Sequence, residues 1–264
     1  VVLGPNLGGW TPIRRGSHWK TQSLTARLKQ EGSFHLRRLL ALWASYDAVL
    51  AFSDYHRQIL SEIGIKPERV RLIHPGVDAA FFPTDRESRD NRTLLFVGDL
   101  SHHKGYQVFL KALARLDGEV EALIAGQGTP DLKLVRSLGI ESSVTHLEFV
   151  ARRNLPYYYN EADLYVCPSM DEMGPNTLVE ALACGTPVVA TDFPGINEYP
   201  PANASVLFSP RSAEALATAL ETALDNLNNL TKAAESYAPN FNANRTVETL
   251  HGIYRDVKDS SLEG

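Results

Sequence analysis

Short apolar runs alternate with segments of helical periodicity along most of the chain. The apolar runs are typical of buried strands, and the periodic segments are typical of helices with one apolar face. Strands are predicted at residues 1–3, 47–52, 69–73, 93–97, 120–125, 144–150, 163–167, 187–191 and 205–208. Helices are predicted at residues 21–28, 33–45, 54–63, 104–116, 131–138, 154–162, 178–183, 213–224 and 243–257. This alternation predicts parallel βαβ units and hence the α/β class.

A polar interval at residues 84–92 interrupts the alternation with a high density of charge and no periodicity. Such a composition is typical of a boundary between domains. We therefore expect a partial, Rossmann-like N-terminal region at residues 1–84 and a Rossmann-like C-terminal domain at residues 85–240. A closing helix within residues 241–264 is expected to pack back toward the N-terminal region.

The composition, with 44% hydrophobic and 22% charged residues, is that of a soluble globular protein. No run of about 18 apolar residues is present, so no membrane span is expected. Cys167 and Cys184 both lie in apolar contexts, which predicts buried, reduced thiols and a cytoplasmic protein. Metal-ligand spacings such as CxxC or HExxH are missing from the sequence, so no bound metal is expected. A cofactor and a nucleic-acid partner are not expected either.

The charge is distributed unevenly, because residues 1–46 are strongly basic and contain Glu31 as their only acidic residue, although the whole chain carries a net charge of −5. A basic segment can approach anionic lipid or a phosphorylated acceptor. A peripheral contact of residues 14–38 with the inner face of a membrane is therefore one interpretation. A solvated basic face without a partner is the other.

Two carboxylates with seven residues between them, Glu172 and Glu180, stand out in the second half of the chain. Glu172 is predicted in a loop that precedes a helix, and Glu180 in the early turns of that helix. The backbone N–H groups near Asn176 and Thr177 are then free to face an anion. A carboxylate can accept hydrogen bonds from adjacent sugar hydroxyls. This loop is therefore predicted to bind a nucleotide sugar, with a helix-capping role as the alternative for Glu180.

Two other predicted strands end in ligand-type residues. Gly98 follows one strand and is expected to let the backbone approach a ligand, while Lys104 is expected to open the next helix with its ammonium toward a diphosphate. Gly126 and Gly128 follow the next strand, where the missing side chains are expected to leave room. Ligands of open parallel sheets bind outside the carboxyl ends of the strands. Together with the glutamate loop, these ends predict a phosphate-and-sugar site.

From about residue 47 to residue 254 the chain resembles the GT-B glycosyltransferases of the large retaining family 4, glycosyl transferases group 1. The resemblance is most specific in the E-x7-E signature, which is followed by Ala-Leu-Ala-Cys-Gly-Thr-Pro-Val-Val at residues 181–189. The other matching segments are residues 47–53, 74–78, 82–83, 95–100, 104–105, 123–128 and 162–169. The resemblance implies a GT-B fold whose C-terminal half binds the donor. Since little sequence precedes the boundary, a truncated N-terminal half is expected.

The resemblance also implies roles for individual residues. Glu180 would hold the ribose hydroxyls, Glu172 would contact the donor sugar, and Lys104 would neutralise the diphosphate, which makes Lys104 and Glu172 the expected catalytic pair. The stretch around Val150 would lie near the nucleobase. The complete expected donor-binding set is Gly98, Asp99, Lys104, Gly126, Val150, Met173, Gly174, Pro175, Asn176, Thr177 and Glu180.

Asp99 is a departure from the family pattern, which usually has an arginine at this position beside the lysine. An anion in place of a cation is expected to weaken both donor binding and transition-state stabilisation. His102 and His103 are candidates to replace the missing positive charge.

The reaction implied by the resemblance is the transfer of a sugar from a UDP-, GDP- or ADP-sugar, with retention at the anomeric carbon and without a metal. The acceptor is expected to be a glycan, a lipid or a small molecule. One alternative is a donor-binding module that is inactive alone and needs a partner subunit. Another is a GT-B-like sugar-nucleotide epimerase, which would act without an acceptor.

Overall fold

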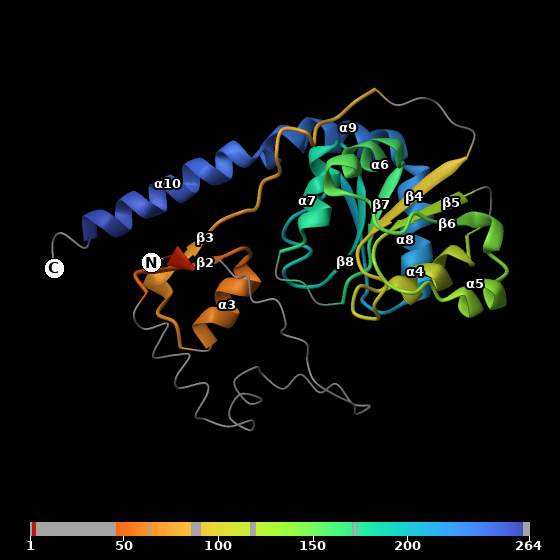
Figure 1. The fold of residues 1–264 in the computed structure, drawn as a ribbon, viewed down its shortest axis with the longest axis horizontal. Coiled ribbons are helices and arrows are strands. Elements are labelled where there is room, and N and C mark those ends of the chain that lie inside the picture. Colours follow the sequence, from red (N-terminus) through yellow and green to blue (C-terminus); the bar gives the residue numbers. More distant parts are fainter. Residues whose placement is uncertain are drawn as a thin grey trace, which may run out of the picture. The chain divides into compact units, whose positions relative to one another are not determined.

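The computed structural model describes residues 2–3, 46–62, 64–85, 91–116, 120–170, 172 and 174–260 (Figure 1). The chain divides into two compact units, Val1–His74 with Val247–Gly264, and Pro75–Thr246. The domain boundaries expected from the sequence stay a prediction. The expected helices at residues 21–28 and 33–45, and the basic segment 14–38, lie outside the described residues.

The larger unit contains a six-stranded, fully parallel sheet in the order β6-β5-β4-β7-β8-β9. Its first strand along the chain, β4, lies in the middle of the sheet, and the direction of strand addition reverses between β4 and β7. This is the topological switch point of a doubly wound fold. The strands are β4 (Arg92–Val97), β5 (Val120–Ala125), β6 (Val144–His146), β7 (Leu164–Cys167), β8 (Val188–Thr191) and β9 (Ser205–Phe208).

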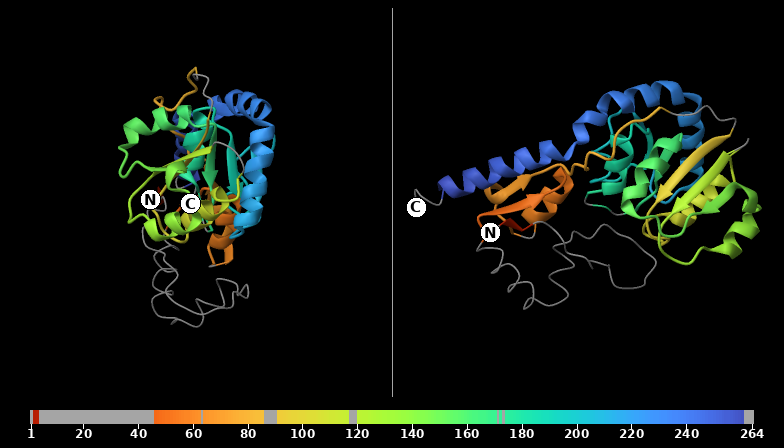
Figure 2. Two further views of the ribbon diagram at one scale, coloured as in Figure 1. Left: turned by 90° about the vertical axis from the view of Figure 1, so that its right-hand side faces the viewer. Right: turned by 45° about the horizontal axis from the view of Figure 1, so that its top comes forward.

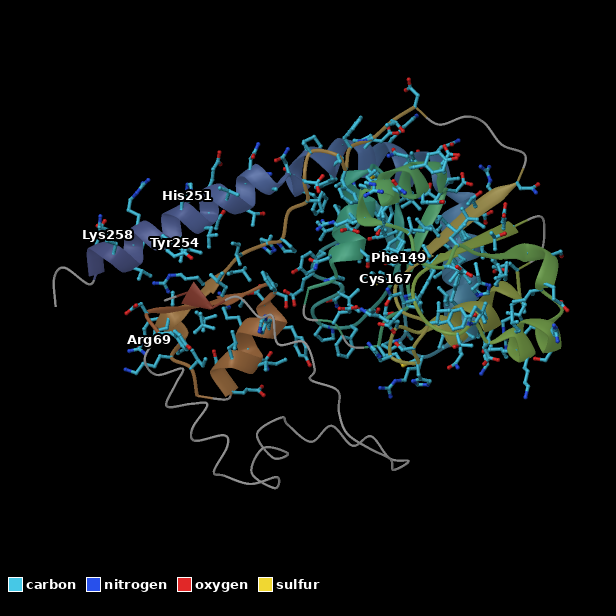
Figure 3. The ribbon with its side chains drawn as sticks, in the orientation of Figure 1. Arg69, Phe149, Cys167, His251, Tyr254 and Lys258 are labelled. Carbon is cyan, nitrogen blue, oxygen red and sulfur yellow. The ribbon has the colours of Figure 1, made fainter. Side chains whose placement is uncertain are left out.

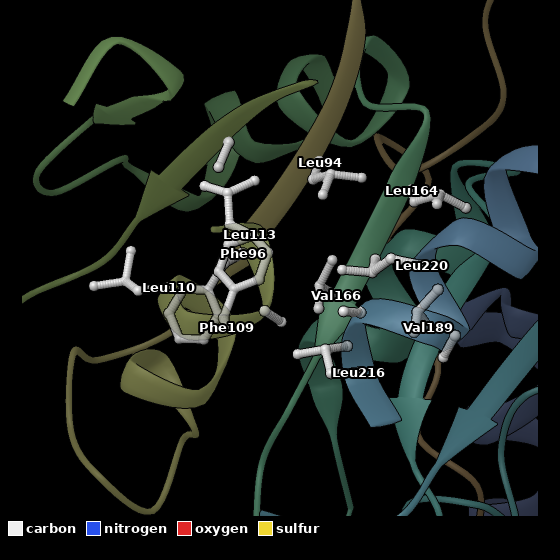
Figure 4. Close-up of a cluster of buried hydrophobic side chains, with 14 of the residues drawn as sticks. Leu94, Phe96, Phe109, Leu110, Leu113, Leu164, Val166, Val189, Leu216 and Leu220 are labelled. Atoms are coloured by element: carbon white, nitrogen blue, oxygen red, sulfur yellow. The ribbon is translucent and has the colours of Figure 1, made fainter. Parts of the chain in front are cut away.

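Helices cover both faces of this sheet, which the rotated views of Figure 2 make visible. On one face, Leu94 and Phe96 of β4 pack in a cluster with Phe109 and Leu220 (Figure 4). The intervening Leu95 belongs to the cluster on the other face, because successive side chains of a strand point to opposite sides. The helices of the first cluster include α4 (Tyr106–Leu113), α5 (Leu132–Leu138) and α8 (Ala213–Asp225), and those of the second include α6 (Leu155–Glu161) and α7 (Asn176–Ala183).

The elements agree with the predicted strands and helices, with three differences. The strand expected at residues 144–150 ends at His146, and Glu148 adopts a left-handed conformation with φ 51°. Lys104 does not open α4, because left-handed Gly105 (φ 74°) precedes the first helical residue, Tyr106. An unpredicted helix, α9 (Leu227–Tyr237), buries Leu227 and Leu230 among many polar residues, which obscured its periodicity.

The smaller unit contains a three-stranded parallel sheet of β1 (Val2–Leu3), β2 (Ala48–Ala51) and β3 (Val70–Leu72), together with α3 (Asp54–Glu62). Ile253 of α10 (Ala243–Ser260) packs with Ala48, Leu50 and Ile73 in its core. The 3-10 helices in the described part of the chain are η1 (Pro67–Arg69), η2 (Glu141–Ser143), η3 (Arg152–Asn154) and η4 (Ala238–Phe241). Within the described residues, no helix combines the length and apolar character that crossing a membrane requires.

Candidate functional site

The carboxyl ends of β4, β5 and β7 lie side by side, because β4 pairs with β5 on one edge and with β7 on the other. The strand ends that the sequence analysis singled out therefore border the switch point. In open α/β sheets this crevice is where ligands bind. The candidate site is built from the loops that follow these three strands.

Glycines let these loops pack backbone against backbone. A Cβ on Gly126 would stand 1.6 Å from the carbonyl oxygen of Gly98, and a Cβ on Gly105 would stand 2.0 Å from that of Pro168. At Gly128 it would meet Leu100 at 3.0 Å. The expectation that the missing side chains of Gly126 and Gly128 leave room for a ligand is therefore corrected, since neighbouring protein atoms occupy that space.

Gly126→Ala is expected to destabilise the protein by about 3 kcal/mol, at the upper end of overpacking effects, because a backbone carbonyl cannot rotate away as a side chain does. Urea unfolding followed by circular dichroism measures the change. Gly252→Ala is the matched control, because a Cβ there meets nothing within 4 Å and the residue lies inside α10. There the free energy of unfolding should rise by up to about 1 kcal/mol. Equal effects of the two substitutions would contradict the packing argument.

The Lys104 ammonium forms an ion pair with Oε1 of Glu172, which joins the loop after β4 to the loop after β7. Ser169 donates a hydrogen bond to the same oxygen at 3.3 Å, and the Met170 N–H donates to the carbonyl oxygen of His103 at 2.7 Å. Burial by itself lowers the pKa of Lys104, but the Glu172 carboxylate, together with smaller effects of Cys167 and Asp99, more than offsets this, so that the pKa lies above its ordinary value. Lys104 is therefore a permanently charged group at the switch point.

Asp99 lies close enough to Lys104 for its charge to contribute to the raised pKa of that residue. Its carboxylate accepts a hydrogen bond from the Ser101 N–H at 3.1 Å, which closes a local turn at the surface. The His103 ring is hydrogen-bonded to the Ser101 hydroxyl at 2.9 Å, and the His102 side chain is exposed. Whether either histidine replaces the missing arginine stays a prediction.

Glu180 is buried in α7, with 5% of its surface exposed. Tyr159 donates to its Oε2 at 3.1 Å, and the Arg152 guanidinium pairs with its Oε1 at 3.0 Å while lying over the Phe81 ring. Burial raises the pKa of Glu180, and Arg152 and Tyr159 bring it part of the way back. Because these partners come from other elements, capping of α7 does not explain this residue.

Tyr165 of β7 is buried and linked to the first turn of α7. Its hydroxyl donates to Oγ1 of Thr177 at 2.7 Å. Burial raises its pKa well above the ordinary value, and the charges of Cys167, Glu172 and Glu180 add to this shift. Glu172 lies in the loop between β7 and α7 and Glu180 lies in α7 itself, so both carboxylates belong to the same strand–loop–helix segment.

The first turn of α7 contributes backbone donors to this site. Pro175 precedes the helix, and no side chain of the described residues caps it. The N–H groups of Asn176 and Thr177 lack the intrahelical partners that later residues have. Gly174 leads into this turn and is half-buried. Met173, which the sequence analysis included in the donor-binding set, lies outside the described residues.

Val150 lies in the loop after β6 and packs against the same cluster as Tyr159. This loop is tied to the end of β5, because the Gly126 N–H donates to the carbonyl oxygen of Glu148 at 2.9 Å. The neighbouring Phe149 is 68% exposed (Figure 3).

Sequence reasoning missed the side chains that hold the two glutamates, namely Ser169, Arg152 and Tyr159. Tyr159 of α6 is fully buried, and its hydroxyl also binds Glu180. No local pattern distinguished this tyrosine from its neighbours. Cys167 (labelled in Figure 3) and Cys184 are buried thiols that form no disulfide within the described residues. Their burial was predicted, and it raises the pKa of Cys167 to about 11.

Solved glycosyltransferase structures share this fold. Sucrose-phosphate synthase from Thermosynechococcus elongatus superposes with a TM-score of 0.77 at 24% identity, covering 88% of this chain and 64% of that one. HepE from Anabaena, in complex with UDP and glucose, superposes with a TM-score of 0.74 at 22% identity and covers 88% and 68% of the two chains.

Among curated proteins, D-inositol 3-phosphate glycosyltransferase from Mycobacterium tuberculosis is 36% identical over 160 residues, which are 54% of this chain and 33% of the relative. The chain thus spans about a third of the length of the curated relatives it matches. The sequence profile of the family described as Glycosyl transferases group 1 matches residues 79–241, which include both glutamates and Lys104. The chain therefore belongs to the glycosyl transferases group 1 family, and its parallel sheet is that of a GT-B glycosyltransferase.

Proposed function

We propose that this chain binds a nucleoside diphosphate sugar and transfers the sugar, with retention, to a glycan, lipid or small-molecule acceptor, as a family 4 enzyme does. One observation carries the proposal: a charged lysine paired with the partly exposed Glu172, the start of α7 and the buried Glu180 of the same helix lie beside the switch point of the sheet. A donor of this class offers a complementary group to each of them, namely a diphosphate and two sets of sugar hydroxyls.

In the proposed complex, the Lys104 ammonium and the N–H groups at the start of α7 bind the diphosphate. Helix starts and ammonium groups both favour anions. Glu180 accepts hydrogen bonds from the ribose hydroxyls, and Glu172 accepts one from the transferred sugar. The residues around Val150 then lie near the nucleobase, and Gly98 and Asp99 border the diphosphate.

The proposed chemistry takes place on one face of the sugar. The bond between the anomeric carbon and the diphosphate oxygen breaks, and the acceptor oxygen forms the new bond on the same side. The acceptor proton passes to the departing diphosphate, so the step needs no carboxylate nucleophile from the protein. Lys104 and the α7 start stabilise the negative charge that develops on the diphosphate. Because they supply this positive charge, the mechanism uses no metal.

The names of the similar proteins support a nucleotide sugar as the donor. The HepE structures contain UDP with glucose and UDP-glucose, and the curated relative is named for transfer to an inositol phosphate. We extend to this chain only the class of donor. The proposed contact of residues 14–38 with an anionic membrane surface remains an expectation from their charge.

Thermal unfolding in the presence of UDP-glucose, GDP-mannose and ADP-glucose tests the proposal. A ligand present at a hundred times its Kd stabilises the folded state by about 2.7 kcal/mol, so the correct donor should raise Tm clearly above the other two. Glucose alone serves as the control and should leave Tm unchanged. If all three nucleotide sugars behave like glucose, the proposal is wrong.

Asp99 favours a second candidate, a donor-binding module that needs a partner subunit for transfer. An anion beside Lys104 opposes the charge that the departing diphosphate develops. Release of UDP or GDP by the purified chain with mixed sugar acceptors separates the two candidates. Donor binding without release supports the module, and release by the chain alone supports the transferase.

A further inference from the structure

The Glu172 carboxylate is held at one of its two oxygens. Oε1 accepts hydrogen bonds from the Lys104 ammonium and from the Ser169 hydroxyl. Among the described residues, none donates a hydrogen bond to Oε2. With 18% of its side-chain surface exposed, Glu172 is partly covered but still accessible from the site.

Ser169 has a fixed position in this arrangement. It lies directly beyond the end of β7 and is 4% exposed. Its loop is tied across the switch point by the hydrogen bond from Met170 to His103 and by the close packing of Gly105 on Pro168. The short serine side chain on this backbone has little freedom to leave Glu172, whereas the lysine ammonium sits on a long, flexible stem.

The two side chains that donate hydrogen bonds to Glu172, those of Lys104 and Ser169, respond differently to a bound nucleotide sugar. Under the proposed function, Lys104 also binds the diphosphate, which draws the ammonium toward a second anion. The Ser169 hydroxyl has no such competing partner in the ligand. When the donor binds, Ser169 is therefore the group that keeps Glu172 in place.

We propose that Ser169 is a positioning residue that holds Oε1 of Glu172, so that Oε2 accepts a hydrogen bond from one hydroxyl of the donor sugar. This inference rests on the proposed function and adds a residue to it. It separates the contacts of the sugar, which depend on Ser169, from those of the nucleoside diphosphate, which do not.

Calorimetric titration of Ser169→Ala tests the inference with three matched pairs of probes: UDP and UDP-glucose, GDP and GDP-mannose, ADP and ADP-glucose. For the pair that the wild type binds, the affinity for the nucleotide sugar should fall about tenfold, because hydrogen bonds to charged groups are among the stronger ones. The affinity for the free diphosphate should stay within about twofold, since its contacts remain. Ser169→Thr, which keeps the hydroxyl, should recover the affinity for the nucleotide sugar.

Ser205→Ala is the matched control, because Ser205 is also buried and donates its hydroxyl to the Pro201 carbonyl oxygen, at the start of β9. It should change neither affinity. Equal losses for both members of a pair in Ser169→Ala would show a merely structural role and overturn the inference, and so would unchanged affinities. A wild type that binds none of the six probes would instead reject the proposed function, and the inference with it.

Discussion

Lys104→Ala is expected to lower kcat/KM for sugar transfer by on the order of a hundredfold, the effect of removing one group that stabilises developing charge in the transition state. The ammonium is the cation that the described site places at the switch point between β4 and β7. Steady-state kinetics with the donor identified by thermal unfolding measure the change. The larger share should appear in kcat, because the negative charge on the diphosphate increases as the bond to the sugar breaks.

Lys111→Ala is the matched control for this substitution. Lys111 is an exposed lysine in the last turn of α4, which follows Lys104 in the chain. Its removal lowers the net charge equally and should leave kcat/KM within about twofold, since exposed charges are screened by salt. Turnover of Lys104→Ala that matches that of Lys111→Ala would rule out the role given to Lys104.

Glu180→Gln is expected to weaken binding of the nucleotide sugar and of the free nucleoside diphosphate alike, each by on the order of tenfold, because the ribose is common to both. The amide keeps an oxygen for the Tyr159 hydroxyl but cannot accept two further hydrogen bonds as the carboxylate does. Titration calorimetry measures both affinities. This pattern differs from that expected for Ser169→Ala, in which only the sugar contact is lost.

The same variant should not lose stability near neutral pH. Burial raises the pKa of Glu180 in the folded protein, so folding favours its neutral form. The contribution of this group to stability is present below the ordinary glutamate pKa of 4.5 and is lost as the pH rises through the higher pKa of the folded state. The neutral glutamine avoids this loss.

Urea unfolding of both proteins across pH 4 to 8 tests the sign of this effect. The free energy of unfolding of Glu180→Gln minus that of the wild type should increase as the pH rises. Glu221→Gln, on the exposed surface of α8, is the control and should show no such trend. If Glu180→Gln instead becomes less stable than the wild type as the pH rises, the interpretation is wrong that Glu180 is kept for binding and costs the protein stability.

Local patterns in the sequence predicted much of the larger unit. The apolar run at residues 93–97 lies within β4, and that at residues 187–191 contains β8, all four residues of which are buried. These predictions succeed because a buried strand needs apolar side chains in consecutive positions, whatever its neighbours are. The pattern failed at α9, where a narrow apolar stripe lies among polar residues.

The sequence by itself determined which residues are available for the chemistry: a lysine after one strand and two glutamates around the start of a helix. Only the tertiary structure decided that β4 lies between β5 and β7, which lets Lys104 form an ion pair with Glu172. It also decided that Ser169 and Tyr159 hold the two carboxylates, and that Gly126 accommodates a neighbouring carbonyl. The reason is physical: periodicity reflects contacts within a few residues, whereas pairing of parallel strands and the partners of buried polar groups depend on segments far apart in the chain.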